Sequence, residues 1–577
     1  MIKNRIESLL KDSIKKAQTN KGLILFDIPK INLEHPENNQ FGDYSSNIAM
    51  QLVKFIHKNP FEIAQIIKDN IDKSDAIEKV EVVKPGFINF YLSKIFLIDQ
   101  LKVINKMGVN FGKNNLGEGK TYMLEFAHPN THKEFHIGHL KNILTGEAVA
   151  KILEAGGYKI IRANYQGDVG MHIAKCLYIV KDLKLESKTL KTINEKIEFL
   201  GKSYTEGNKA YESDEKAKKE IIELNKKIYA RDKSILALWQ ETRSWSLEYF
   251  DKIYEQVNTK YDRFYFESEV WQRGLEIVKE NLDKGIFEKS EGAVIFDGEK
   301  HNLHKRVFIT KEGTPTYEAK DMALAELQFE EYNPDKIIHV VGPEQSEYFR
   351  VIFKALEQIS KELSDKEKYL PYGWVQLKHG KMSSRKGQVV RGLWLIEEVE
   401  KKIKEIVEKS DKIKIKQAEV IKKIALGAIK YSFLRLSLNQ NISFDINESV
   451  SFEGESGPYL QYSIVRIKSI LEKSKVENLP EVENVEYLEK SEEIKLLRKL
   501  YIFPEIIEEA GKLYEPHLIA SYIYELSQDF NSFYGNVRIL QEKDDNIKMA
   551  RFSLIKAVAQ VIENGLKLLG IETVEKM

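Results

Sequence analysis

In the stretch PNTHKEFHIGHLKN, residues 129–142, His136 and His139 flank an isoleucine and a glycine. His136 and His139 can each donate a hydrogen bond to a phosphoryl group whose negative charge grows in a transition state. Gly138, between them, lets a flat base or a phosphate approach the backbone. A helix that begins near His139 would point its unpaired backbone N–H groups to the same place. The stretch therefore suggests phosphate chemistry, although taken alone it fits two ordinary histidines near a helix start better.

A second segment with the composition of a ligand-binding loop is LKHGKMSSRKGQVV, residues 377–390. Among its cations, Lys381, Arg385 and Lys386 flank small serine and glycine residues, which is typical of an exposed, mobile loop. One such basic turn needs no ligand. Two segments of this kind, each at the edge of one half of a nucleotide-binding sheet, are poorly explained by chance.

Regular elements that could position both segments flank them. TYMLEFA (121–127) predicts a strand, HLKNILTGEAVAKILEAGG (139–157) a helix, and YKIIRANYQGD (158–168) a second strand. A similar order returns with a helix after GTPTYEAKD (313–321) and a strand at KIIHVVG (336–342). We therefore expect a parallel sheet in two halves, typical of a Rossmann-like nucleotide-binding domain.

The remaining chain predicts a multidomain protein that combines α/β and all-α parts. Residues 1–110 indicate a small N-terminal α/β domain, and residues 111–400 the Rossmann-like domain. A long, charged, helical stretch at about 175–290 predicts a helical insertion into that domain, after which strand patterns resume at AVIFDG and KRVFIT. Residues 401–577 have a helical apolar period almost throughout, which predicts a helix bundle.

Composition bounds the class of protein. The chain has 89 basic and 88 acidic residues, so its bulk charge gives no case for a nucleic acid or a membrane surface. Its single cysteine, Cys176, excludes an internal disulfide framework and a cysteine zinc cluster, and we expect no metal site. Because no signal peptide or long apolar run is present, we expect a cytoplasmic protein without a membrane segment.

The two segments together resemble the signatures of class I aminoacyl-tRNA synthetases, in which His-Ile-Gly-His and a Lys-Met-Ser-Lys-Ser loop hold ATP. PNTHKEFHIGH, NYQGDVG, GTPTYEAKD, VVGPEQ and the ending AVAQVIENGLKLLGIETVEKM resemble the arginyl-tRNA synthetase family, and the resemblance runs over essentially the whole chain. It implies activation of L-arginine by ATP with Mg²⁺, without a tightly bound cofactor, and transfer to tRNA(Arg). It also implies an anticodon-binding role for the C-terminal bundle. We expect a monomer.

Arginine needs a binding site with carboxylates, because its side chain is a planar fork that stays charged. Carried over from the family, Glu125 and Asp321 would face the guanidinium, with Tyr317 beside them. Asn130 and Gln345 match positions that hold polar groups of the substrate. An ordinary exposed helix start for Tyr317 and Asp321, and an outward-facing strand residue for Glu125, are the alternatives.

The resemblance also assigns the nucleotide contacts. ATP would be held by His136, Gly138, His139, Lys381, Met382 and Ser383. The chain departs from the family where Ser384 takes the place of the second signature lysine, so a positive charge for the leaving pyrophosphate is missing there. Lys386 or Lys133 could replace it, and we favour Lys133 as the main replacement, with Lys381 and Lys386 supporting it.

Contacts to tRNA are expected in two places. Asn89 and Phe90 lie in a part that resembles the family's N-terminal domain, which touches the tRNA D-loop. Aromatic and polar residues of the bundle are candidates for stacking on unpaired anticodon bases: Tyr459, Gln461, Tyr462, Arg466, Phe530 and Tyr534. Aromatic residues at helical spacing are, however, more often core.

Three rival interpretations remain. GKNNLGEGKT (112–121) imitates a P-loop, but its glycine spacing is wrong and a strand follows where a helix is required, so we expect a domain-joining turn. A class I synthetase for another amino acid is disfavoured by Glu125 and Asp321. A catalytically silent tRNA-binding relative is disfavoured by the intact His136, Gly138, His139 and Lys381.

Overall fold

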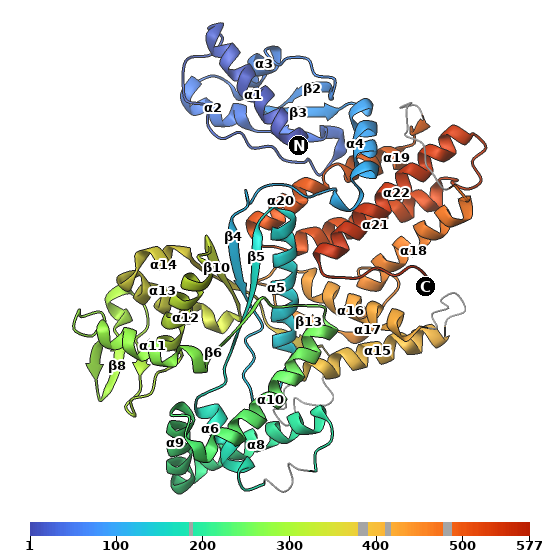
Figure 1. Ribbon diagram of the computed structural model, residues 1–577. Helices are drawn as coiled ribbons and strands as arrows, with labels where there is room; N and C mark the ends of the chain where they lie inside the picture. The colour runs from blue at the N-terminus through green and yellow to red at the C-terminus, as the bar shows by residue number, and fades with distance from the viewer. Residues whose placement is uncertain (184–188, 379–389, 410–416, 477–486) are drawn as a thin grey trace. The chain divides into compact units, whose positions relative to one another are not determined.

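The computed structural model describes residues 1–183, 189–378, 390–409, 417–476 and 487–577 (Figure 1). The chain forms two compact units. Unit 1 consists of residues 1–113, 463–508 and 522–565, and unit 2 of residues 114–462, 509–521 and 566–577.

The N-terminal part of unit 1 is the small α/β domain that we expected. Its three-stranded antiparallel sheet has the order β1-β3-β2. On α1, Ile6, Leu10 and Ile14 are fully buried, as their spacing of four predicts for one helix face. The elements are α1 (Ile2–Thr19), β1 (Tyr44–Ser46), α2 (Ile48–Ile56), α3 (Pro60–Asp69), β2 (Ile77–Val83), β3 (Phe87–Leu92) and α4 (Lys94–Met107).

Residues 1–113 pack against the C-terminal helices within unit 1. The hydroxyl of Tyr44, fully buried, donates to Glu505 at 2.5 Å. Arg498 pairs with the buried carboxylate of Asp43 at 3.1 Å. The first and last parts of the sequence are therefore joined through buried polar contacts as well as through apolar ones.

The centre of unit 2 is a five-stranded, entirely parallel sheet with the order β11-β10-β4-β5-β6. Adjacent β4 and β10 belong to the two halves of the sequence, so the strand order reverses between them, which is where such sheets bind ligands. Figure 1 shows α5 on one side of this sheet and α12 and α13 on the other. The strands are β4 (Thr121–Glu125), β5 (Lys159–Gln166), β6 (Arg263–Phe266), β10 (Lys336–Val341) and β11 (Glu367–Pro371).

In the described part of the chain between β5 and β6, the helices are α6 (Met171–Val180), α8 (Ile193–Ser213), α9 (Glu215–Tyr229) and α10 (Lys233–Gln256). The chain then returns to the central sheet at β6, well before residue 290, where we expected the helical insertion to end. After α11 (Glu267–Glu280), the strand patterns near 293 and 306 form a separate antiparallel sheet. It consists of β7 (Glu288–Ser290), β8 (Ala293–Phe296) and β9 (Arg306–Ile309).

The second half of the sheet is covered by α12 (Tyr317–Tyr332), α13 (Ser346–Ile359) and α14 (Lys361–Lys366), while α5 (Ile137–Ala155) connects β4 to β5. The P-loop imitation at 112–121 contains turns and leads into β4, so no helix follows it. It therefore lacks the strand–loop–helix context of a phosphate loop.

The C-terminal region is helical, as expected, apart from a short parallel pair of β12 (Val375–Leu377) with β13 (Ile442–Phe444). Among the described residues, no helix is long and apolar enough to cross a membrane. The helices are α15 (Gly392–Lys409), α16 (Ala418–Leu434), α17 (Ile446–Ser449), α18 (Gly457–Ser474), α19 (Ser491–Leu500), α20 (Phe503–Leu513), α21 (His517–Asn536) and α22 (Asp545–Leu568).

Candidate active site

Helix α5 begins at Ile137, earlier than we expected, and His136 is its N-cap. The Nδ1 atom of His136 accepts hydrogen bonds from the backbone N–H groups of Gly138 at 3.1 Å and His139 at 3.4 Å. His139 returns the contact, because its Nδ1 accepts from the backbone N–H of His136 at 3.2 Å. The N–H groups that we expected to face a phosphate are thus satisfied by a histidine side chain.

This capping arrangement fixes the protons on both rings. A backbone N–H can only donate, so Nδ1 carries no proton in either His136 or His139, and the proton of the neutral ring sits on Nε2. Burial, reinforced by Lys133, lowers the pKa of His136 to about 4. Burial and the neighbouring His136 also lower the pKa of His139. Both rings are therefore neutral at pH 7, and each has one Nε2–H donor to offer to a phosphate.

The histidine motif is joined directly to the end of the basic segment 377–390. The backbone N–H of Ile137 donates to the carbonyl of Val390 at 2.9 Å. Beside this contact, the guanidinium of Arg391 pairs with Glu134 at 2.6 Å. The two segments that the sequence separates by more than two hundred residues therefore meet at the start of α5.

The expected nucleotide contacts of the basic segment lie outside the described residues: Lys381, Met382, Ser383 and Lys386. Lys133 is described, and its ammonium lies 5.1 Å from the centre of the Tyr204 ring. Burial, followed by repulsion from Lys175, lowers the pKa of Lys133, and Lys133 in turn contributes to the low pKa of His136. The structure therefore brings a cation near the histidine motif.

The loop between β4 and α5 has an unusual backbone. Ala127, His128 and His132 have positive φ angles of 85°, 49° and 62°, which non-glycine residues seldom adopt. The side chain of Asn142, on α5, supports the loop by accepting from the backbone N–H of Ala127 at 2.6 Å. Strain of this kind is found where a backbone must present groups to a ligand.

Asn130 and Gln345 both follow strands of the central sheet at their carboxyl ends. Asn130 is bridged to Gly167, where an added Cβ atom would lie 2.0 Å from the Asn130 side-chain oxygen. Glycine at 167 is therefore needed for this close approach. The Gln345 side chain accepts from the backbone N–H of Gly342 at 3.3 Å. Both residues lie at the edge of the sheet where ligands bind.

Tyr317 and Asp321 occupy successive turns at the start of α12, as their spacing predicted. The Tyr317 side chain is 47% exposed and available to a ligand. Asp321 accepts from the hydroxyl of Tyr348 at 2.7 Å. Burial, opposed by the hydrogen bond from Tyr348 and reinforced by the charge of Glu125, raises the pKa of Asp321 to about 7. The Asp321 carboxylate thus lacks a cationic partner strong enough to keep it fully ionised.

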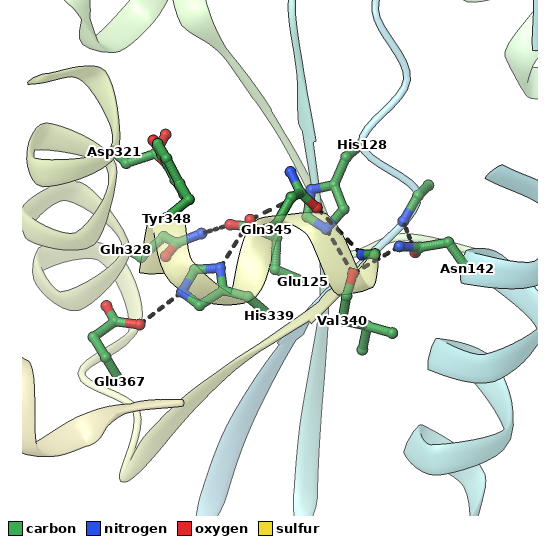
Figure 2. A network of polar contacts seen from close by, with 12 residues as sticks. Glu125, His128, Asn142, Asp321, Gln328, His339, Val340, Gln345, Tyr348 and Glu367 are labelled. Atoms are coloured by element: carbon green, nitrogen blue, oxygen red, sulfur yellow. Dashed lines mark hydrogen bonds and ion pairs between the residues drawn. The ribbon is translucent and has the colours of Figure 1, made fainter. Parts of the chain in front are cut away.

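Glu125 is only 2% exposed, so it is not an outward-facing strand residue. Its carboxylate accepts hydrogen bonds from Gln328 at 2.5 Å and from His339 at 3.0 Å, with His128 at 3.5 Å (Figure 2). Burial alone would raise the pKa of Glu125, but the charge and hydrogen bond of His339, together with His128 and Gln328, outweigh burial and lower it. Glu125 and Asp321 line one small cavity of about 20 Å³, so the structure brings the two predicted carboxylates together.

Sequence reasoning missed a third carboxylate, Glu267, which follows β6 at its carboxyl end. Glu267 is 2% exposed and accepts a hydrogen bond of 2.5 Å from Lys320, which lies on α12 between Tyr317 and Asp321. Burial raises the pKa of Glu267 although Lys320 opposes the shift. The available signal was its position directly after a strand, but the four-residue strand was itself not predicted.

The chain matches known protein families over most of its length. Residues 101–446 match "tRNA synthetases class I (R), catalytic domain", residues 460–577 match "DALR anticodon binding domain", and residues 4–92 match "Arginyl tRNA synthetase N terminal domain". The arginine–tRNA ligase of Clostridium botulinum is 34% identical over 577 residues, covering 100% of both chains. That of Borreliella afzelii is 32% identical over 595 residues, again covering 100% of both.

The chain belongs to the arginyl-tRNA synthetase family. The fold agrees, because the structure of Thermus thermophilus arginyl-tRNA synthetase covers 100% of both chains with a TM-score of 0.82 at 24% identity. The prediction of a class I arginine–tRNA ligase is thereby confirmed, and the two rival functions are set aside. Membership of this class implies the use of ATP.

Two residues that we expected to touch tRNA from the N-terminal domain of this synthetase are buried in the structure. Phe90 is 0% exposed, and Asn89, at 2% exposure, accepts a hydrogen bond of 2.7 Å from Ser45. The ring of Phe90 cannot stack on a base without leaving the core, so this expectation is corrected. Phe87, on the same strand and 36% exposed, is more accessible than Phe90, and Tyr91 is partly exposed.

The expected anticodon residues of the synthetase fall into two groups. Gln461 and Phe530 are both 0% exposed, and Gln461 donates to the carbonyl of Glu572 at 2.7 Å, so neither is placed to read a base. Tyr534 is 46% exposed, and the guanidinium of Arg466 lies 5.4 Å from its ring centre. Two further members of the expected set are partly exposed: Tyr459 and Tyr462.

Proposed function

We propose that this synthetase activates L-arginine with MgATP and transfers the arginyl group to the terminal ribose of tRNA(Arg) at the carboxyl edge of its parallel sheet. One observation carries the proposal: the histidine motif, the end of the basic segment and the pocket of Glu125 and Asp321 all belong to the elements that surround β4 and β10. Phosphate groups and a guanidinium could therefore be held at one edge of one sheet.

In the first step, the carboxylate of arginine attacks the α-phosphate of ATP, the bond to the leaving pyrophosphate breaks, and arginyl-adenylate forms. The Nε2–H groups of His136 and His139 would donate to phosphoryl oxygens as their charge grows. Lys133 would neutralise the leaving pyrophosphate, supported by Lys381 and Lys386. This chemistry requires positioning and charge stabilisation, and no covalent nucleophile from the protein.

For the amino acid, Asp321 and Glu125 would supply the negative charge that the guanidinium requires, and Tyr317 would line the pocket beside them. Asn130 and Gln345 would hold polar groups of the substrate. The partly open ring of Tyr317 and the incompletely ionised Asp321 support this assignment, because a cation that arrives there would gain a carboxylate partner.

For tRNA, the exposed Tyr534 with its neighbour Arg466 supports base stacking by the C-terminal helices, together with Tyr459 and Tyr462. In the N-terminal domain, exposure favours Phe87 over Phe90 as the ring that meets the D-loop. A monomer in the cytoplasm completes the proposal, and the single cysteine fits a reducing compartment.

The test is ATP–pyrophosphate exchange with each of the twenty amino acids, with and without tRNA(Arg). We expect exchange with arginine alone among them, and only when tRNA is present, because the family resemblance implies that the acceptor end completes the site. Exchange driven by a different amino acid would refute the substrate assignment. Exchange with arginine but without tRNA would refute only the requirement for tRNA.

A further inference from the structure

His339 stands between two buried carboxylates in the middle of the sheet. Its Nδ1 lies 3.0 Å from an oxygen of Glu125, and its Nε2 lies 2.7 Å from an oxygen of Glu367. Glu125, His339 and Glu367 thus form a row. It follows from the strand order, since β10 carries His339 and pairs with β4 on one side and β11 on the other. Figure 2 shows the three side chains in a line across the sheet.

The geometry of this row assigns the charge of the ring. An ionised carboxylate only accepts hydrogen bonds, so each ring nitrogen must carry a proton for both contacts to form, and His339 is then an imidazolium. Burial lowers the pKa of His339, but Glu125 and Glu367 outweigh burial and raise it well above the ordinary range. With both carboxylates ionised, the row has a net charge of minus one; burial raises the pKa of Glu367, although His339 opposes that shift.

Three other titratable groups interact with the row: His128, Asp321 and Tyr165, and burial keeps the pKa of Tyr165 well above its ordinary value. His128 lies 3.5 Å from Glu125 and has a pKa lowered by burial, so it adds no charge at pH 7. Asp321 lines the same cavity as the three members of the row. The charge of His339 lowers the pKa of Asp321 while that of Glu125 raises it. His339 therefore favours ionisation of both carboxylates of the proposed arginine pocket.

We propose that His339 is a positioning residue for arginine recognition, which holds Glu125 ionised and in one orientation by bridging it to Glu367. The inference rests on the proposed function, because it requires Glu125 to belong to the arginine pocket. Gln328 and His339 each occupy one oxygen of Glu125, which leaves lone pairs on both oxygens for a cation.

Stability alone does not explain this row. A buried ion pair seldom stabilises a fold more than well-packed apolar residues of similar volume would. The His339 ring already packs against Phe349, with ring centres 5.0 Å apart, so an apolar residue has suitable neighbours here. The imidazolium of His339 also keeps Glu125 ionised, which an apolar residue at this position could not do.

The first test compares His339→Asn and His339→Phe with the wild-type protein by ATP–pyrophosphate exchange at saturating tRNA between pH 5.5 and 8.5. In the wild type, kcat/KM for arginine should fall as the pH is lowered. Loss of the imidazolium should shift this fall to higher pH by about one unit or more, so kcat/KM at a given acidic pH should be about tenfold lower. The KM for ATP should stay within about twofold, since the row lies on the amino-acid side. His304→Asn, at an exposed histidine, is the matched control and should change neither.

The second test is a double-mutant cycle with Glu367→Gln. In His339→Asn two buried carboxylates remain without their cation, so removing one of them should restore part of the lost activity. The variant His339→Asn with Glu367→Gln should therefore activate arginine better than His339→Asn alone. If His339→Asn fails to fold, as judged by circular dichroism, His339→Phe takes its place in the same cycle.

The outcomes separate the two proposals. A folded wild-type protein that does not activate arginine would refute the proposed function. A wild-type protein that does so, with His339 variants that keep its acid limb and its KM for arginine, would overturn the role of His339. Strictly additive losses in the cycle would overturn it as well.

Discussion

Arginine binding should depend on pH through Asp321, whose pKa of about 7 leaves it half protonated in the neutral range. A guanidinium requires the ionised form, so affinity is lost as pH falls through that pKa. About one tenth of the protein has an ionised Asp321 at pH 6 and about nine tenths at pH 8, so the apparent Kd for arginine should be about tenfold weaker at pH 6. Binding at pH 7 should also release about half a proton.

Isothermal titration of arginine in buffers of different ionisation enthalpy measures both quantities. Asp321→Asn removes the titrating group while keeping its shape, so its affinity should be about ten- to a hundredfold weaker at pH 8 and should lose the pH dependence. Tyr348→Phe is the matched variant, because it removes the hydrogen bond that opposes the rise in pKa and should shift the dependence to higher pH. Wild-type affinity that stays flat from pH 6 to 8, without proton release, would refute this reasoning.

Three further outcomes are expected. In single-turnover adenylate formation at saturating tRNA, Lys133→Ala should lose about 10²–10³ in rate. A near wild-type rate there, with collapse in Lys386→Ala, would place the compensating charge in the basic segment. Tyr534→Ala should raise the KM for tRNA about five- to a hundredfold, from about 1–3 kcal/mol per stacked base, with kcat unchanged at saturation; an unchanged KM would exclude stacking on this ring. The buried ammonium of Lys430 donates to two backbone carbonyls, and burial lowers its pKa from 10.5 to about 8. The unfolded chain then binds more protons between those values, so the free energy of unfolding should gain up to about 3 kcal/mol as pH rises from 8 to 10.5. Denaturant unfolding should show a slope that is steeper by this amount in the wild type than in Lys430→Met, because Lys141, whose pKa burial also lowers to about 8, contributes equally to both.

Sequence patterns predicted the elements that are long and strongly periodic. The strand before the histidines, the helix after them and the C-terminal bundle could be found because their apolar residues recur with one clear period. The four-residue strand β6 could not, since RFYF is too short to stand out beside long charged helices. Missing that strand also hid Glu267, whose position follows from where β6 ends.

Side-chain environments were less accessible to sequence reasoning. Gln461 and Phe530 lie near partly exposed aromatic residues in the sequence, but helical spacing does not say which face is covered by neighbouring helices. The start of α5 depends on the ring of His136, whose capping role is not a usual one for histidine. His339 reads as one polar residue in an apolar strand, and its importance is visible only once β4 and β11 are known to flank it.

Unit 1 combines the first part of the sequence with segments near its end, and this has a consequence for synthesis of the chain. Its N-terminal part leaves the ribosome first, but the partners of Asp43 and Tyr44 are Arg498 and Glu505. The roughly 450 residues between Tyr44 and Arg498 take about 20 to 90 seconds to translate at about 5–20 residues per second. During that interval the side chains of Asp43 and Tyr44 lack the helices that later bury them. The N-terminal domain can therefore complete these buried polar contacts only after most of the chain has been made.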